Sequence, residues 1–293
     1  MRFAYAGFDC WRAVFEAFVA HGWEPVALYT QPLNNGLDSN DEMVARARHF
    51  NIPVQLSKIC PDDLRALEQR DCDALIVGGY HWRIPDWSAH LRYAVNFHPS
   101  PLPEGRGPFP LTQAIVEGRR EWAISCHRVA PSFDTGALLD SERLALDADE
   151  CYETLQLRLQ MAARRLATRV ARDFQRAWDE SQPQGEGSYW PVLTDAQKTL
   201  DFTRPVDEVM RIVRACGLSE ECLAPLQGAR VFVRRATAWV EAHDYTPGQI
   251  VHRYQRWIVI AAADGFVVLI EWSTLSRSQR RLVGGTIDGW CGL

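Results

Sequence analysis

Three side chains that could carry out acid–base chemistry lie in two short segments of the chain. Asn96 and His98 occur in VNFHPSP (95–101), directly after an apolar stretch, and Asp134 occurs in SFDTG (132–136). Residues two apart in a strand point to the same side, and proline ends a strand, so an amide and an imidazole are expected together at a strand end. With a carboxylate beside them, they would form an acid–base set with a donor for a developing oxyanion.

The pattern alone leaves two interpretations open. An Asn-x-His sequence at the end of a strand is frequent in polar clusters that only cap the strand, and the other interpretation is a catalytic site. The two interpretations differ in whether Asp134 reaches Asn96 and His98 at one rim of a sheet.

The elements around these residues predict how they are positioned. Short apolar runs alternate with amphipathic stretches, which is typical of β-α-β units and a Rossmann-like, mainly parallel sheet of the α/β class. Ligands bind such sheets outside the carboxyl ends of the strands, where Asn96 and His98 are expected. The expected strands are 3–7, 24–30, 53–56, 73–80, 94–98, 122–129 and 136–146, and the expected helices are 11–22, 41–50, 61–70, 109–118 and 150–174.

The composition of the chain changes after residue 180. Residues 180–191 (ESQPQGEGSYWP) are rich in Gly, Pro, Ser and Gln, which is typical of a linker. A helix is expected over 204–217, and β-type runs follow at 229–240, 248–254 and 256–272, the last divided by an Asp-Gly turn. The sequence therefore predicts a large domain, a linker and a small β-rich, barrel-like domain, over 1–180, 181–203 and 204–293 respectively.

The composition indicates a globular protein. The chain has 293 residues, of which 47% are hydrophobic and 24% charged, as expected for one large domain and one smaller one. The first residues, MRFAYAG, lack the pattern of a signal peptide, and no run approaches the ~20 apolar residues of a membrane span. We therefore expect a soluble, cytoplasmic protein without a membrane partner.

Several kinds of chemistry have no support in the sequence. None of the eight cysteines forms a C-x-x-C pair, so neither a metal site nor redox chemistry is indicated. The net charge of −5 does not favour a nucleic-acid partner, although a local basic patch could still bind one. Two groups of arginines could form such a patch, but we expect both to be solvated faces: Arg158, Arg165, Arg169 and Arg172, and Arg277, Arg280 and Arg281.

The wider sequence resembles a known family of enzymes. NFHPSPLPEGRGPFPLTQAIVEG (96–118), followed by ISCHRVAPSFDTGALL (124–139), resembles the N10-formyltetrahydrofolate-dependent formyltransferases, which include the methionyl-tRNA and the amino-sugar N-formyltransferases. The resemblance covers about 1–180 and identifies that part as the formyltransferase catalytic domain. SYWPVLTDAQKTLDFTRPVDEVMRIVRA (188–215) resembles, more loosely, the start of the OB-like C-terminal domain of the methionyl-tRNA and UDP-amino-arabinose enzymes.

The resemblance implies roles for individual residues. Asn96 and His98 would donate to the formyl oxygen, His98 would also help to remove the proton of the attacking amine, and Asp134 would orient His98 or a water. The formyl group arrives activated on the folate co-substrate, so neither a metal nor a covalent nucleophile is needed. The folate would lie against the loop after residue 78 and the turn before Asp134, and the expected contacts are Gly79, Tyr80, Trp82, Arg83, Ile84, Ser132 and Phe133.

The resemblance leaves the amine acceptor open. The methionyl-tRNA enzymes carry a basic insertion after the second strand, whereas TQPLNNGLDSNDE (30–42) has three acids and neither Lys nor Arg. Binding of a polyanion needs cations near the phosphates. His127, a strand residue facing either the core or the cleft, is also more frequent in the small-molecule enzymes of this family.

We therefore predict a small-molecule amine as acceptor, most simply a nucleotide-linked amino sugar. A carrier-bound amino acid or a siderophore precursor remains open, and methionyl-tRNA is the alternative. A formyltetrahydrofolate hydrolase or a non-catalytic folate-binding protein are the alternatives of another class. Turnover without any amine would identify a hydrolase, and binding without turnover a folate-binding protein.

Overall fold

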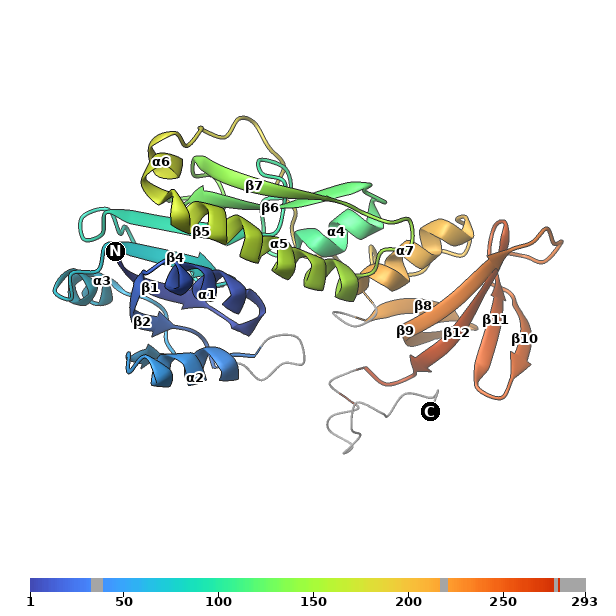
Figure 1. The fold of residues 1–293 in the computed structure, drawn as a ribbon. Helices are drawn as coiled ribbons and strands as arrows, with labels where there is room; N and C mark the ends of the chain where they lie inside the picture. Colours follow the sequence, from blue (N-terminus) through green and yellow to red (C-terminus); the bar gives the residue numbers. More distant parts are fainter. Residues whose placement is uncertain (33–38, 217–220, 277–278, 280–293) are drawn as a thin grey trace. The chain divides into compact units, whose positions relative to one another are not determined.

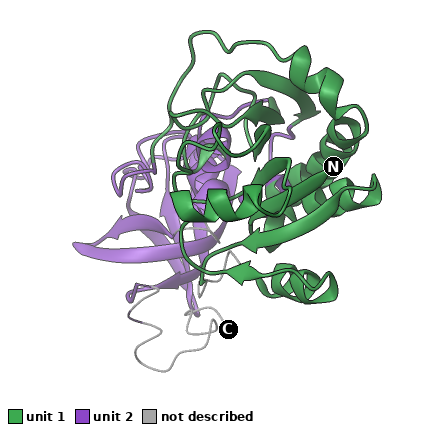
Figure 2. Ribbon diagram, turned by 90° about the vertical axis from the view of Figure 1, so that its left-hand side faces the viewer, with its two compact units in different colours: residues 1–110, 121–145, 156–191 green, residues 111–120, 146–155, 192–293 purple. Residues whose placement is uncertain are grey.

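The structure, a computed structural model, describes residues 1–32, 39–216, 221–276 and 279. Two compact units divide the chain (Figure 2), and unit 1 contains residues 1–110, 121–145 and 156–191. Unit 2 contains residues 111–120, 146–155 and 192–293. Within the described ranges, no helix has the length and hydropathy needed to cross a membrane.

Unit 1 is built on a seven-stranded sheet in the order β3-β2-β1-β4-β5-β6-β7 (Figure 1). Strands β1 to β5 are parallel, and β6 and β7 run antiparallel to their neighbours. This confirms the predicted mainly parallel α/β sheet. The strands are β1 (Arg2–Gly7), β2 (Glu24–Tyr29), β3 (Val54–Gln55), β4 (Ala74–Gly78), β5 (Tyr93–His98), β6 (Glu121–Arg128) and β7 (Leu138–Ala145).

Helices cover both faces of this sheet. On one face, the rings of Phe3, Phe18 and Trp23 pack in a cluster with that of Phe174, and the Trp23 and Phe174 centroids lie 4.9 Å apart. On the other face, Leu64 packs with apolar residues of β1, β2 and β4. The helices are the 3-10 helix η1 (Asp9–Trp11), α1 (Arg12–Ala20), α2 (Asp41–His49), α3 (Pro61–Glu68), α4 (Pro110–Val116), α5 (Tyr152–Arg172) and α6 (Phe174–Asp179).

Unit 2 contains a five-stranded antiparallel sheet in the order β10-β11-β12-β9-β8. Helix α7 (Val206–Cys216) packs against β8, β9 and β12 through a buried stripe that includes Val209 and Val213. Its first turn is held by Asp264 in the predicted Asp-Gly turn, whose Oδ1 accepts the N–H of Val206 at 2.8 Å. This confirms the predicted β-rich C-terminal domain. The strands are β8 (Cys222–Leu226), β9 (Ala229–Val240), β10 (Ile250–Tyr254), β11 (Trp257–Ala261) and β12 (Gly265–Ser273).

Residues 182–190, which we call the strap, were expected within a linker but are an ordered part of unit 1. Gln182 and Leu138 exchange backbone hydrogen bonds of 2.7 and 2.9 Å. The N–H of Arg106 donates to the carbonyl of Ser188 at 3.0 Å, and the N–H of Trp190 donates back to Arg106 at 2.6 Å. The glycines and polar residues of the strap therefore reflect an extended segment packed closely on a loop, and not a free connection. The chain passes from unit 1 to unit 2 for the last time after residue 191, and the division into two domains remains a proposal.

Candidate active site

Asn96 and His98 lie at the carboxyl end of β5 and point to the same side, because side chains alternate along a strand. β5 pairs antiparallel with β6, which places His127 directly opposite Asn96. The amide Nδ2 of Asn96 donates to Nε2 of His127 at 3.1 Å, and Nδ1 of His127 donates to the carbonyl of Arg128 at 2.8 Å. The His127 side chain, which the sequence left between core and cleft, is thus buried and hydrogen-bonded to Asn96.

Asp134 completes this cluster from the turn between β6 and β7. Its Oδ1 lies 3.4 Å from Nδ2 of Asn96, 3.4 Å from Nδ1 of His98 and 3.6 Å from Nε2 of His127. Its Oδ2 accepts the N–H of Gly107 at 3.0 Å. The structure therefore brings the three expected residues together and adds His127 to them, while the catalytic roles of Asn96, His98 and Asp134 remain predictions.

The protonation of His98 follows from its surroundings. Its Nε2 donates to the carbonyl of Gly105 at 2.9 Å, so the neutral ring carries its proton there and Nδ1 faces Asp134. Burial lowers the pKa of His98, and the opposing effects of Asp134 and of the Gly105 carbonyl do not restore it. The ring is therefore neutral near pH 7, and a proton taken up at Nδ1 would be stabilised by the adjacent carboxylate.

The carboxylate of Asp134 is held in its charged form. Burial on its own would raise the pKa of Asp134, but the nearby imidazoles of His127 and His98 and the N–H of Gly107 together lower it to about 2. A charged carboxylate in contact with two imidazoles stabilises whichever ring takes up a proton.

The pKa of Asp134 predicts a pH-dependent contribution to stability. A carboxyl with a pKa of about 2 in the folded chain, against an ordinary 3.8, contributes about 2 kcal/mol at 1.36 kcal/mol per pKa unit. This contribution is complete above about pH 4 and is lost as the pH falls through 2. In Asp134→Asn the stability should fall by about 2 kcal/mol less than in the wild type between pH 5 and 2, measured by urea unfolding. If the free energies of unfolding of the two proteins fell equally with pH, the low pKa of Asp134 would be contradicted.

The loop after β5 presents its backbone to the cluster. Trp122 Nε1 donates to the carbonyl of Pro99 at 2.8 Å and anchors the start of this loop. Gly105 and Gly107 have φ values of 72° and 115°, a region that side chains disfavour. A Cβ at Gly107 would also come within 2.4 Å of the carbonyl oxygen of Trp190. These two glycines allow a carbonyl to face His98 and an N–H to face the Asp134 carboxylate.

The segments expected to contact the folate lie side by side. A guanidinium nitrogen of Arg83 donates to the carbonyl of Pro131 at 2.7 Å, which joins the loop after β4 to the turn before Asp134. Gly79 has a φ of 81°, and a Cβ there would come within 2.7 Å of Trp11. Only glycine therefore fits this position.

The expected contact residues differ in what they expose. Tyr80 lies in the core, where its hydroxyl accepts the N–H of Ile59 at 2.8 Å, so only its backbone is available to a ligand. Trp82 and Ile84 are half-buried against the same core. Ser132 is exposed, and the ring of Phe133 is 55% exposed beside Asp134. Phe133 therefore offers a flat apolar surface at the rim of the cluster, and the folate contacts as a set remain a prediction.

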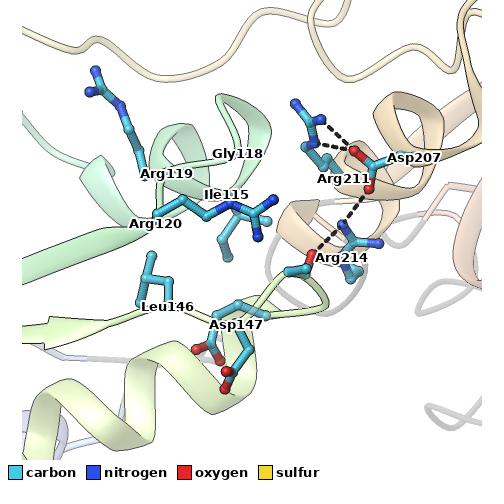
Figure 3. Close-up of a pocket in the computed structure, with 11 residues that line it drawn as sticks. Ile115, Gly118, Arg119, Arg120, Leu146, Asp147, Asp207, Arg211 and Arg214 are labelled. Carbon is cyan, nitrogen blue, oxygen red and sulfur yellow. Dashed lines mark hydrogen bonds and ion pairs between the residues drawn. The ribbon is translucent and has the colours of Figure 1, made fainter.

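A pocket in unit 2 and the distribution of metal-ligating side chains provide the comparison with this cluster. A small pocket of about 30 Å³ within unit 2 (Figure 3) contains Arg211 and Arg214, and both pair with Asp207, at 3.0 and 3.6 Å. None of its lining residues is His, Cys or Lys. Among the residues that the structure describes, no three His, Cys, Asp or Glu side chains are grouped to hold a metal. The cluster around Asp134 is therefore the better candidate for a reaction centre.

Two family models match most of the chain. The model described as formyl transferase matches residues 45–171, and the model described as formyl transferase, C-terminal domain, matches residues 192–279. Among individual relatives, the methionyl-tRNA formyltransferase of Xanthomonas euvesicatoria is 29% identical over 278 residues, covering 90% of both chains. That of Janthinobacterium is 24% identical over 290 residues and covers 92% of both chains.

Solved structures of similar fold come from two groups of proteins. The N-formyltransferase of Helicobacter canadensis, solved with folinic acid and dTDP-3-aminofucose, superposes with a TM-score of 0.69 at 15% identity, over 92% of this chain and 98% of its own. HypX of Aquifex aeolicus, solved with tetrahydrofolic acid, superposes with a TM-score of 0.68 at 17% identity over 99% of this chain. The chain spans about half of HypX, 48% of its length. At these identities, the likeness is one of fold.

Proposed function

Because the chain belongs to the formyltransferase family, we propose that it transfers the formyl group of N10-formyltetrahydrofolate to the primary amine of a small molecule, most simply an amino sugar carried on a nucleotide. The observation that carries the proposal is the convergence of Asn96, His98 and Asp134 in one buried cluster at the carboxyl end of β5. An N-formyltransferase needs such a set, because it has to take a proton from an amine and stabilise charge on a carbonyl oxygen.

The rim of the cluster fits a folate co-substrate. N10-formyltetrahydrofolate supplies a formyl group that is already activated for attack by an amine. The exposed ring of Phe133 and the bare backbone of Gly79 offer a surface for a flat heterocycle, and the hydrogen bond from Arg83 to Pro131 holds their two segments together. The formyl end would then reach the side chains of the cluster.

Each side chain of the cluster has a task in this reaction. The amide of Asn96 donates to His127 and Asp134 in the structure, and release of one of these bonds frees an N–H for the formyl oxygen. One donor of this kind is worth about 3–4 kcal/mol. His98 takes up the proton of the amine, and Asp134 stabilises the resulting imidazolium. Fixed placement of the reactants contributes a further ~7–11 kcal/mol.

Three of the four arginines in the group on α5 are paired with acids. On α5, Arg165 and Arg169 both pair with Glu142, and Arg169 also pairs with Asp140 at 3.0 Å. Arg172 pairs with Asp173 at 2.9 Å. These pairs offset the charge of Arg165, Arg169 and Arg172 with neighbouring acids, which supports a small acceptor.

The arginines of unit 2 follow the same pattern. Arg230 pairs with Asp195 at 2.5 Å, and Arg234 and Arg235 lie 3.7 and 3.5 Å from Glu271. Arg277, Arg280 and Arg281 lie outside the described residues, so the structure does not bear on them. The three arginines of β9 thus share two carboxylates, which offset most of the positive charge that a polyanion would need.

The segment after β2 also carries acids where the tRNA enzymes carry bases. Asp38 lies outside the described residues, while Asp41 and Glu42 begin α2. Glu42 forms an ion pair with Arg12, and the carboxylate of Asp9 accepts the hydroxyl of Ser39 at 2.7 Å. The described ends of this segment thus present no cation to a phosphate backbone.

Methionyl-tRNA is the second candidate acceptor. The observation in its favour is that relatives with this activity match the chain over about nine-tenths of its length, including the C-terminal domain. An acceptor with many phosphates and a small amine differ sharply in their dependence on salt, because release of counterions weakens polyanion binding at high ionic strength.

We expect formylation of a nucleotide-linked amino sugar and little formylation of charged initiator tRNA. Both acceptors are assayed with N10-formyltetrahydrofolate at about 50 and 200 mM salt, a range over which binding through 6–10 phosphates weakens by about 10³–10⁵. A small acceptor should keep its rate within about 3-fold. Carrier-bound amino acids complete the panel.

A reaction without acceptor serves as the control. Rapid loss of the formyl group without an amine would identify a hydrolase, and binding without turnover on any acceptor would identify a folate-binding protein. Efficient formylation of the tRNA that falls steeply with salt would replace our choice of acceptor by methionyl-tRNA.

A further inference from the structure

The side chain of Gln184 in the strap joins the two loops that hold the acid–base cluster. Its Nε2 donates to the carbonyl of Asp134 at 2.9 Å and to that of Gly136 at 2.7 Å. Its Oε1 accepts from Nε of Arg106 at 3.2 Å and from a terminal nitrogen of the same guanidinium at 2.9 Å. A glutamine amide has two N–H donors and one carbonyl acceptor, so every polar group of this side chain is used within unit 1.

The two loops need to be held, because their conformations are unfavourable on their own. Asp134 has a φ of 58°, a left-handed conformation that is uncommon for residues other than glycine. Such residues persist only where their surroundings determine them, at a cost of about 1–3 kcal/mol. Gln184 binds the carbonyl of Asp134 itself and that of Gly136 two residues on, and so fixes the turn on both sides.

The carbonyl oxygen of the Gln184 side chain binds the loop after β5 through Arg106. Arg106 stands between the two glycines that face the cluster, since the carbonyl of Gly105 accepts from His98 and the N–H of Gly107 donates to Asp134. The strap also supports Gly105 directly, because its N–H donates to the hydroxyl of Ser188 at 3.0 Å. The strap therefore fixes the backbone of the loop that binds both His98 and Asp134, and in this way it sets the distance between these two side chains.

We propose that Gln184 is a positioning residue for formyl transfer, which holds the carboxylate of Asp134 against the imidazole of His98 without touching substrate. The inference rests on the proposed function for its kinetic effect. Its structural part, the dependence of the His98–Asp134 contact on Gln184, can be measured without any substrate.

The kinetic test compares Gln184→Ala with Gln182→Ala. Gln182 lies in the same strap, but its exposed side chain donates, among the described residues, to the carbonyl of Glu180 alone, at 2.6 Å. We expect Q184A to lower kcat by about 10–100-fold, because displacement of a catalytic group by about 1 Å costs up to that much, while KM changes by less than about 3-fold. Q182A should keep the wild-type kcat. Equal kcat for wild type, Q182A and Q184A would overturn the proposal.

A third variant separates positioning from loss of packing. Gln184→Glu keeps the oxygen that accepts from Arg106 but sets a carboxylate against the carbonyls of Asp134 and Gly136. We expect Q184E to be at least as impaired as Q184A. Recovery of the wild-type kcat in Q184E would show that only the bond to Arg106 matters, and would also overturn the proposal.

The pH titration of the His98 ring, followed by NMR of labelled imidazole, tests the positioning role without any measurement of formyl transfer. The carboxylate of Asp134 raises the pKa of His98 against the effect of burial, so withdrawal of the carboxylate should move that titration to lower pH in Q184A and not in Q182A. An unchanged titration in Q184A contradicts the proposal. A shifted titration in a protein that formylates no amine would leave the positioning role in place and reject the proposed function instead.

Discussion

Replacement of His98 by alanine is expected to lower kcat/KM for formyl transfer by at least about 100-fold while the fold stays intact. The ring is 6% exposed and is anchored at Nε2 by the carbonyl of Gly105, which leaves Nδ1 beside the carboxylate of Asp134. Alanine removes both the group that takes up the amine proton and the partner of that carboxylate. The measurement is a steady-state assay with the best acceptor of the panel, beside thermal unfolding of the same protein.

Two further variants make the result for His98 specific. His98→Gln offers an amide that can still donate to Gly105 but cannot take up a proton, so it should be as inactive as H98A. His90→Ala removes a histidine of unit 1 whose Nδ1 bonds to Glu68 at 2.7 Å, away from the cluster, and should keep full activity. Turnover near the wild-type rate in either His98 variant would remove this residue from the mechanism.

Replacement of Asp134 by asparagine is expected to reduce kcat by a similar factor, at least about 100-fold. Three side chains, those of Asn96, His98 and His127, lie within 3.6 Å of its Oδ1. An amide in this place carries no charge to stabilise a protonated ring, and its NH2 group would oppose the amide of Asn96. The loss should appear mainly in kcat, because the carboxylate acts on His98 and not on the binding of substrate.

An aspartate outside the cluster provides the comparison for Asp134. Asp179 is exposed at the end of α6 and accepts only from Gln175 among the described side chains, at 3.0 and 2.9 Å. Asp179→Asn should therefore be as active as the wild type. Equal activity of the two variants would mean that the buried carboxylate serves the fold alone.

Local patterns in the sequence were enough to predict most of the elements and to single out Asn96, His98 and Asp134. Helix α3 begins at Pro61, as the position of proline in a first helical turn indicates, and Asp63 caps it by accepting the N–H of Cys60 at 2.8 Å. Asn96 and His98 share a face because the period of a strand is two. Features of this kind depend on a few neighbouring residues, and are therefore readable without the fold.

Features that depend on pairing between distant segments were not predicted. β6 and β7 had been expected as strands, but their antiparallel direction was not, and that direction is what sets His127 opposite Asn96. The place of the Tyr80 side chain was not predicted either, because its ring lies in the core and its hydroxyl bonds to the distant backbone of Ile59. The role of Gln184 was not predicted, because the residues around it in the sequence have the composition of a linker.

The division of the chain has a consequence for recombination between relatives. Unit 2 is assembled from residues 111–120, 146–155 and 192–293, so it is not a cassette that a single crossover can transfer. A chimera joined after residue 191 would inherit the last of these segments from one parent and the first two from the other. The guanidinium of Arg211 lies within about 3 Å of where a Cβ on Gly118 would stand. A side chain at position 118 from one parent would therefore clash with Arg211 from the other. Exchange of the whole of unit 2 therefore requires three segments to be transferred together, through five junctions.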